Sequence, residues 1–312
     1  MIDRARVPLN PIERSAVIDD GVLEVKFEFD SEADERVPGL LVKSATSPPG
    51  PLPVVIVLHG TGGNKEAMKG LLQVLARRGV LGVAFDARYA GERAKHGKGS
   101  EDYRAAILET WKSGERFPFY YDTVWDLQRL LDYLETRSDV DPKRIGGIGF
   151  SKGGTELYLA AAVDQRIVAS VPCIGVQSFD WALKNNAWQS RVGTIQSAVD
   201  GAARELQQGT VDAAFVRRFY QRVVPGIESD FDGPQMLPLI APRPLLVING
   251  DRDDRTPGPG VKLCVDAARE AYGQQEASQN FEFRSQPNVG HAVTPESQQY
   301  AVDWLIRQLR SK

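Results

Sequence analysis

A six-residue stretch with the sequence GFSKGG, from Gly149 to Gly154, lies between two apolar segments. The segment before it, 144–148, is typical of a short buried strand, and the segment after it, 155–163, is typical of a buried helix. A strand that turns this sharply into a helix needs small residues two positions either side of its centre, and Gly149 and Gly153 flank Ser151 in this way. Such a turn lifts a hydroxyl above the sheet edge, beside a helix N-terminus. The stretch therefore predicts a nucleophile elbow centred on Ser151.

Apolar runs alternate with amphipathic segments along most of the chain, which favours a mostly parallel, doubly wound α/β sheet with helices on both faces. The predicted strands are 22–29, 37–42, 54–58, 80–85, 144–148, 167–171, 244–249 and 281–285. The predicted helices are 65–78, 103–112, 124–134, 155–163, 261–272 and 295–309. Right-handed crossovers place the carboxyl ends of parallel strands along one edge, where ligands bind.

Residues 175–240 show no buried-strand pattern, and we interpret them as a helical cap or lid inserted into a single domain that spans 1–312. Aromatic side chains are frequent in this insertion: Phe179, Trp181, Trp188, Phe215, Phe219 and Tyr220. Most of them are expected to pack the insertion onto the sheet. Trp181 and Trp188 are the candidates for a substrate pocket at the rim.

The composition is that of an ordinary globular protein, with 42% hydrophobic and 25% charged residues. A net charge of −3 gives no reason to expect nucleic acid or an anionic membrane as a partner. No apolar stretch follows the charged N-terminus, and no run approaches the length of a membrane span. These features predict a cytoplasmic protein without a signal peptide.

A serine hydroxyl attacks an ester only when a neighbouring base takes its proton. The chain has three histidines. His96 lies in a charged segment and is expected to be solvated, whereas His59 opens a glycine-rich loop and is expected to fix that loop by hydrogen bonds. His291 follows the last predicted strand, so it is the candidate base. So few histidines, with no nearby His/Cys cluster, predict no metal and no other cofactor.

The acid that orients the base is expected within 249–257, which follows a buried strand. Three carboxylates compete there: Asp251, Asp253 and Asp254. The position of these side chains relative to the strand end does not by itself decide among them.

An ester under attack also needs N–H donors for its developing oxyanion. The backbone amide of Lys152 comes with the elbow, and a second donor is expected from the loop 59–63, at the backbone of Thr61. The alternative is that 59–63 is only a tight strand-to-helix turn. The side chain of Lys152 is expected to be a surface charge.

Taken in order, these motifs resemble the α/β-hydrolase superfamily, and more closely its dienelactone-hydrolase and prolyl-oligopeptidase-like esterase branch. The resemblance runs from about Pro53 to the C-terminus and rests on HGTGG at 59–63, DARYAGER at 86–93, DVDP at 139–142, RI at 144–145, GFSKGG at 149–154, Asp253, and GH at 290–291. The superfamily's chain order is nucleophile, acid, histidine. The resemblance therefore implies Asp253 as the acid, because its place between Gly250 and Pro257 is similar to the superfamily's G-x-x-D-x-x-x-P turn.

The resemblance implies a serine hydrolase that cleaves small-molecule carboxylic esters through a Ser151–His291–Asp253 triad. The chain departs from dienelactone hydrolases in having Ser151 where they use cysteine, and in its insertion. A peptidase or amidase on the same fold is one alternative, although the roughly 50 residues before the first core strand are too few for a β-propeller. The other alternative is a non-catalytic ligand-binding homologue, for which an acid that orients His291 has no purpose.

Overall fold

The computed structural model describes residues 4–14 and 16–310. Its strands form one ten-stranded sheet. The strands are β1 (Ile12–Glu13), β2 (Val17–Asp19), β3 (Val22–Glu32), β4 (Glu35–Ser44), β5 (Leu52–Leu58), β6 (Leu81–Phe85), β7 (Val140–Phe150), β8 (Ile167–Cys173), β9 (Leu245–Gly250) and β10 (Phe281–Gln286). The sheet order is β1-β3-β4-β6-β5-β7-β8-β9-β10, with β2 paired to β3.

The strands from β5 to β10 pair in parallel, whereas β1 to β4 pair antiparallel at one edge of the sheet. Every residue of β5, β6 and β9 is buried, which is why these strands appear in the sequence as unbroken apolar runs. The predicted mostly parallel α/β sheet is confirmed.

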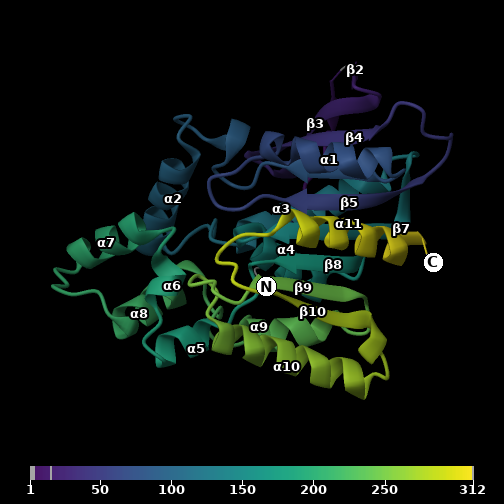
Figure 1. The fold of residues 1–312 in the computed structure, drawn as a ribbon. Helices are drawn as coiled ribbons and strands as arrows, with labels where there is room; N and C mark the ends of the chain where they lie inside the picture. The colour runs from purple at the N-terminus through teal and green to yellow at the C-terminus, as the bar shows by residue number, and fades with distance from the viewer. Residues whose placement is uncertain (1–3, 15, 311–312) are drawn as a thin grey trace.

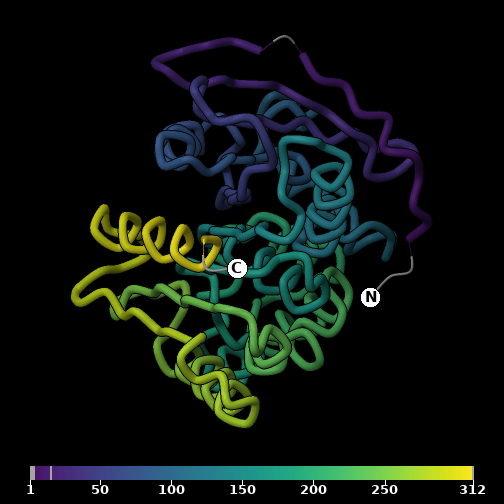
Figure 2. The backbone as a smooth tube through the Cα atoms, turned by 90° about the vertical axis from the view of Figure 1, so that its right-hand side faces the viewer, coloured from purple at the N-terminus to yellow at the C-terminus, as the bar shows by residue number. Residues whose placement is uncertain are grey.

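Helices cover both faces of the sheet (Figures 1 and 2). The core helices are α1 (Lys69–Arg77), α3 (Tyr121–Glu135), α4 (Lys152–Val163), α10 (Gly258–Gln274) and α11 (Pro295–Arg310). Alternate residues of β5 point to opposite faces of the sheet. Val55 and Val57 belong to the hydrophobic cluster that includes side chains of α1 and α11. Val54, Ile56 and Leu58 belong to the hydrophobic cluster that includes side chains of α3, α4 and α10.

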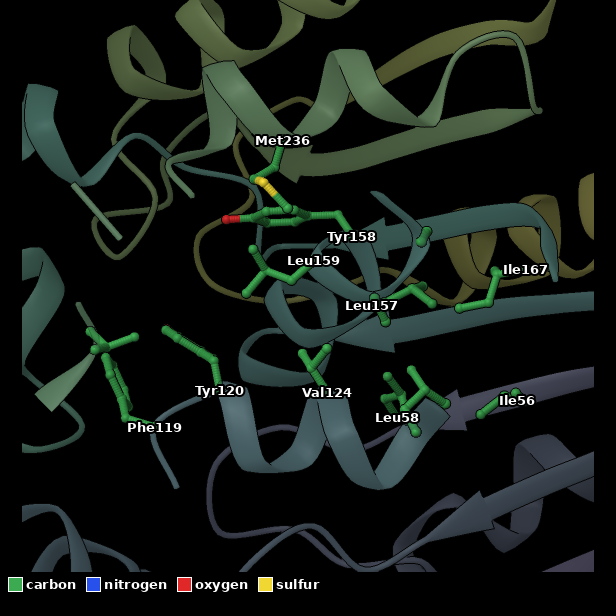
Figure 3. Packing of buried hydrophobic residues seen from close by; sticks show 14 of the residues in the cluster. Ile56, Leu58, Phe119, Tyr120, Val124, Leu157, Tyr158, Leu159, Ile167 and Met236 are labelled. Atoms are coloured by element: carbon green, nitrogen blue, oxygen red, sulfur yellow. The ribbon is translucent and has the colours of Figure 1, made fainter. Parts of the chain in front are cut away.

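On the face of the sheet that α3 and α4 cover, the core contains side chains that the sequence pattern predicted to lie on helices. Figure 3 shows Val124 of α3 and Leu157 and Leu159 of α4 over Ile56 and Leu58 of the sheet. The helix that follows the elbow is therefore buried on more than one side, which explains why 155–163 is almost uniformly apolar in the sequence.

The sheet extends beyond the predicted strands. The strand predicted at 144–148 begins earlier, because β7 starts at Val140, which pairs with Leu52 across an irregularity in the register. The short strands β1 and β2 were not predicted, because they are exposed and too short to show an apolar alternation.

The segment between β8 and β9 is helical. Its first part, up to residue 223, lies beyond one end of the sheet, beside α2 (Gly99–Ser113), and its last part packs beside α10 (Figure 1). It contains α5 (Phe179–Lys184), α6 (Gln189–Val192), α7 (Gln196–Glu205), α8 (Ala213–Val223), α9 (Gly233–Met236) and the 3-10 helix η3 (Leu237–Ile240). Trp111 of α2 stacks on Phe219 of α8, with ring centroids 5.6 Å apart. We refer to residues 175–240 as the insertion.

The side chain of Asp232 forms hydrogen bonds to residues near both ends of the insertion. Its buried carboxylate accepts hydrogen bonds from the hydroxyl of Ser178 at 2.7 Å, from the amide of Phe179 at 2.7 Å and from the amide of Gly233 at 2.8 Å. One side chain thus caps the start of both α5 and α9. Across the described residues, no helix combines the length and the apolar character that crossing a membrane requires.

Candidate active site

Ser151 lies at the sharp turn between β7 and α4, with φ 54° and ψ −117°. A residue other than glycine rarely adopts such a conformation, and it persists only where the surroundings enforce it. Here the amide of Ser151 donates to the carbonyl of Cys173 at 2.9 Å, and its own carbonyl accepts from the amides of Gly154 and Thr155. The structure therefore has the strained strand-to-helix turn that the sequence predicted at Ser151.

The flanking glycines are required by close backbone contacts. A Cβ atom at Gly149 would lie 2.2 Å from the carbonyl oxygen of Gly153, and a Cβ at Gly153 would lie 2.6 Å from the carbonyl oxygen of Leu58. Both distances are far below van der Waals contact, and the opposing atoms belong to the backbone of the sheet and the helix. The turn can therefore form only if both positions lack a side chain.

We expect Gly153→Ala to lower the free energy of unfolding by roughly 2–4 kcal/mol, because the core strand β5 must move to admit one methyl group. Gly70→Ala in α1 is the matched control, since nothing lies within 4 Å of the added Cβ. That variant should be neutral or up to about 1 kcal/mol more stable. Urea unfolding of both variants measures this, and equal stabilities would contradict a tightly packed elbow.

Three predicted residues from three loops form a continuous chain of hydrogen bonds. Ser151 Oγ lies 2.7 Å from His291 Nε2. His291 Nδ1 lies 2.8 Å from Oδ2 of Asp253 and 3.0 Å from its Oδ1. Asp253 follows β9 and His291 follows β10, so the parallel strand order brings their loops to the edge where Ser151 ends β7.

Asp253 is held as a charged carboxylate. Burial alone would raise the pKa of Asp253, but hydrogen bonds from His291 and Thr256 outweigh burial and hold this pKa below its ordinary value. The backbone amide of Arg255 donates to the same carboxylate at 2.9 Å. The two competing carboxylates, Asp251 and Asp254, are exposed, so among the three it is Asp253 that meets the histidine.

Two backbone amides lie where an oxyanion could be bound. Thr61 lines the same pocket as Ser151 and His291, and Lys152 begins α4 directly after the serine. Among the hydrogen bonds of residues 4–14 and 16–310, neither amide N–H has an acceptor. Both N–H groups are therefore available to a ligand, as an oxyanion site requires.

The side chain of Lys152 was expected at the surface, but it is buried. Its ammonium pairs with the fully buried carboxylate of Glu156 and lies 5.2 Å from the ring centroid of Tyr103 in α2. This contact could not be predicted from the sequence, because α2 lies in a charged segment that is far from the elbow along the chain.

His59 forms hydrogen bonds that fix its loop, as the sequence predicted. His96 lies away from the site, and its exposed side chain is paired to Asp102. His59 Nε2 accepts from the amide of Ala87 at 3.2 Å, so Nδ1 carries the proton and donates to the carbonyl of Gly60 at 2.8 Å. Burial, with the positive charge of Lys152, lowers the pKa of His59 to about 4. The ring is therefore neutral at neutral pH.

This pKa predicts a pH-dependent stability. Between about pH 6.5 and pH 4, the unfolded chain binds a proton at His59 that the folded chain does not, so stability is full above pH 6.5 and falls as the pH falls. We expect this group to contribute about 2 kcal/mol to the loss of unfolding free energy between pH 7 and pH 5. His59→Gln should flatten the wild-type curve by that amount in urea unfolding at the two pH values. Parallel curves would contradict a buried neutral His59.

The pocket in front of Ser151 is narrow, with a volume of about 40 Å³. Residues before α3 and residues around α6 of the insertion form its walls, together with the loop after β9: Phe119, Tyr120, Gln177, Ser190, Arg191, Thr194, Arg255 and Thr256. A volume of this size holds about three water molecules at about 10–15 Å³ each. The pocket therefore fits a small chemical group beside the serine.

The structure does not bring Trp181 and Trp188 into this pocket. Trp181 packs toward α10, where a Cβ at Gly260 would lie 3.3 Å from its ring, and Trp188 packs against the main hydrophobic cluster. The prediction that these two tryptophans line the pocket was wrong, because the sequence shows which residues are aromatic but not how the insertion is oriented on the sheet. The pocket residues that were missed include Tyr120 and Arg191. For Arg191 there was a signal: no acidic residue occurs between Asp180 and Asp200, so no local partner exists for it.

Comparisons with known proteins find similar hydrolases and esterases. A family model described as glucuronyl esterase, fungi, matches residues 39–275. The putative hydrolase YtaP of Bacillus subtilis is 27% identical over 90% of this chain and 86% of its own length. A 4-O-methyl-glucuronoyl methylesterase of Neurospora crassa is 27% identical over 56% of this chain, but this match spans only 44% of that enzyme.

Solved structures support the same fold. An acetyl xylan esterase from Paenibacillus sp. R4 superposes with a TM-score of 0.67 at 20% identity, covering 96% of this chain and 89% of that one. A glucuronoyl esterase from Solibacter usitatus superposes with a TM-score of 0.66 at 18% identity, covering 98% of this chain and 88% of that one. These likenesses show the α/β-hydrolase fold, and the family match extends over most of the chain. The chain is an esterase of the α/β-hydrolase fold and belongs to the glucuronyl esterase family.

Proposed function

We propose that this esterase hydrolyses esters of carbohydrates, with Ser151 as nucleophile, His291 as general base and acid, and Asp253 as the group that orients the histidine. The observation that carries the proposal is the unbroken hydrogen-bond chain from Asp253 through His291 to Ser151, which lies at a strained turn. Such an arrangement has a cost in backbone strain that a binding protein has no reason to retain.

The reaction proceeds in two halves. His291 Nε2 takes the Ser151 proton as Oγ attacks the ester carbonyl, and the amides of Thr61 and Lys152 donate to the oxyanion. The tetrahedral intermediate collapses, His291 protonates the leaving alcohol, and an acyl-serine ester remains. Water then attacks this ester while His291 takes its proton, the acid leaves, and Ser151 regains its hydrogen. Asp253, kept charged by its hydrogen bonds, stabilises the imidazolium in both halves.

The carbohydrate part of the proposal is supported by the family and by its named relatives, which include glucuronoyl methylesterases and, by fold, an acetyl xylan esterase. The narrow pocket supports a small group beside the serine, such as the methyl of a methyl ester or an acetyl group. A sugar ring does not fit in this volume, so the proposal places the sugar outside the pocket.

A panel of four substrates tests the proposal: a methyl glucuronate ester, an acetylated xylo-oligosaccharide, p-nitrophenyl acetate and the matching p-nitroanilide. We expect turnover of at least one carbohydrate ester with kcat/KM above that for p-nitrophenyl acetate, and little turnover of the anilide. Faster cleavage of the anilide would favour an amidase. Hydrolysis of p-nitrophenyl acetate alone would contradict the carbohydrate specificity while leaving the esterase mechanism intact.

A further inference from the structure

Arg191 is a buried cation in the pocket that contains Ser151 and His291. It belongs to α6 of the insertion, and the residue is 6% exposed. Its Nε donates to the hydroxyl of Ser190 at 3.0 Å. Among the described residues, no carboxylate forms an ion pair with Arg191, and its two terminal nitrogens, Nη1 and Nη2, have no protein acceptor.

A buried guanidinium without an ion pair is costly for the folded protein, because burial removes the charge from water and no carboxylate in contact replaces the lost hydration; Asp253 attracts it only from a distance. Burial lowers the pKa of Arg191 for the same reason. The ring of Phe179, whose centroid lies 5.4 Å from Cζ, offsets only a part of this cost. Stability therefore gives no reason for an arginine at this position.

The position of Arg191 is nevertheless fixed by specific contacts. The hydroxyl of Tyr220 donates to the backbone carbonyl of Arg191 at 2.7 Å, and Phe179 packs edge-on against Tyr220 with ring centroids 5.3 Å apart. The guanidinium is thus held by the aromatic core of the insertion while it lines the pocket. A preorganised donor with free N–H groups is what recognition of a planar anion requires.

The charges around the pocket point the same way. No aspartate or glutamate is among the residues that line it, and Asp253 lies behind His291, with both of its oxygens engaged. Lys152 is neutralised by Glu156, whereas Arg255 lines the pocket, is exposed, and has no ion pair within the described residues. The residues that line the pocket therefore carry positive charge and no negative charge, and the nearby carboxylate of Asp253 attracts Arg191 without contacting it.

We propose that Arg191 binds a free carboxylate of the substrate, so that the preferred ester carries an acid group close to the bond that is cleaved. A carboxylate fits the small volume of the pocket and matches two guanidinium N–H groups in a planar, bidentate contact. The acid group can belong to the acyl part, as in a half-ester of a dicarboxylic acid, or to a neighbouring sugar acid in a partly esterified chain. This inference rests on the proposed ester hydrolysis and names the class of ester.

Paired substrates separate the charge of the acid group from its shape. Monomethyl succinate and methyl succinamate differ only in a carboxylate that becomes a neutral amide, and a diuronic acid with one methyl ester can be compared with its dimethyl ester. We expect the wild type to prefer the acid member of at least one pair by about 10- to 100-fold in kcat/KM, as expected for a buried charged hydrogen bond. The pair that shows the preference identifies the part of the substrate that carries the acid.

Arg191→Gln should reduce this preference to within about threefold, and Arg191→Lys should restore a part of it, because a point charge returns without the bidentate geometry. Arg269→Gln removes an exposed arginine from α10 and is the matched control, which should keep the wild-type preference. Removal of an unpaired buried charge should also leave the free energy of unfolding unchanged or increased. That result would show that the loss of preference does not come from misfolding.

A binding measurement is independent of turnover. Calorimetry of succinate with Ser151→Ala should give a dissociation constant that Arg191→Gln, added to the same variant, weakens by at least about tenfold. Equal kcat/KM for acid and amide in both pairs, or equal succinate binding with and without Arg191, would overturn the proposal while ester hydrolysis still stands. Failure of every ester, with succinate still bound through Arg191, would instead overturn the proposed function.

Discussion

Replacement of Ser151 by alanine should lower kcat for ester hydrolysis by at least about 10⁴-fold, the largest effect expected of any single substitution in this chain. The reason is that, among residues 4–14 and 16–310, the hydroxyl of Ser151 is the one that lies within hydrogen-bond distance of His291 Nε2, at 2.7 Å. What remains of the site could stabilise an oxyanion but could not form an acyl intermediate.

The measurement is a progress curve with p-nitrophenyl acetate, followed by the best carbohydrate ester. Ser229→Ala, which removes an exposed hydroxyl in the insertion, is the control and should retain wild-type kcat. Circular dichroism of both variants should match the wild type. A Ser151→Ala variant that keeps more than about a tenth of the wild-type rate would remove this serine from the mechanism.

Asp253→Asn should lower kcat by about 10⁴-fold with little change in KM. The asparagine has almost the same shape, but its amide donates where the carboxylate accepts, so it favours the tautomer of His291 that has its proton on Nε2. That tautomer cannot take the proton of Ser151. The substitution also removes the negative charge that the hydrogen bonds of His291 and Thr256 maintain in the folded enzyme.

Asp251→Asn and Asp254→Asn are matched controls, because both carboxylates lie in the same loop and are exposed. Each should change kcat by less than about threefold. If either control loses more activity than Asp253→Asn, the acid has been assigned to the wrong residue, whatever the distance between Asp253 and His291.

The sheet could be predicted from the sequence because its strands have signals that are local. Val54–Leu58 is an unbroken apolar run, and Gly149 to Gly154 specify a turn that few other sequences permit. The parallel order then follows from chain connectivity, and with it the meeting of loops from β7, β9 and β10. Local pattern and general topology were sufficient to bring Ser151 and His291 to one edge.

What could not be predicted depends on contacts between distant segments. Residue type alone left Asp251, Asp253 and Asp254 equivalent, and only the resemblance to a known acid turn favoured the second. The burial of Lys152 depends on α2, and the wall of the pocket depends on how α6 docks. Tryptophans at 181 and 188 were plausible pocket residues by chemistry, but packing against α10 and the core directs them elsewhere.

The central claim is that hydrolysis proceeds through an acyl-enzyme intermediate on Ser151. Its most direct test is mass spectrometry of the protein quenched in acid during turnover of p-nitrophenyl acetate. The account predicts one acetyl group per chain, found on the peptide that contains Ser151 and absent from the Ser151→Ala variant. Turnover with no acylated intermediate in the wild type, or with the acetyl group on another residue, would contradict it.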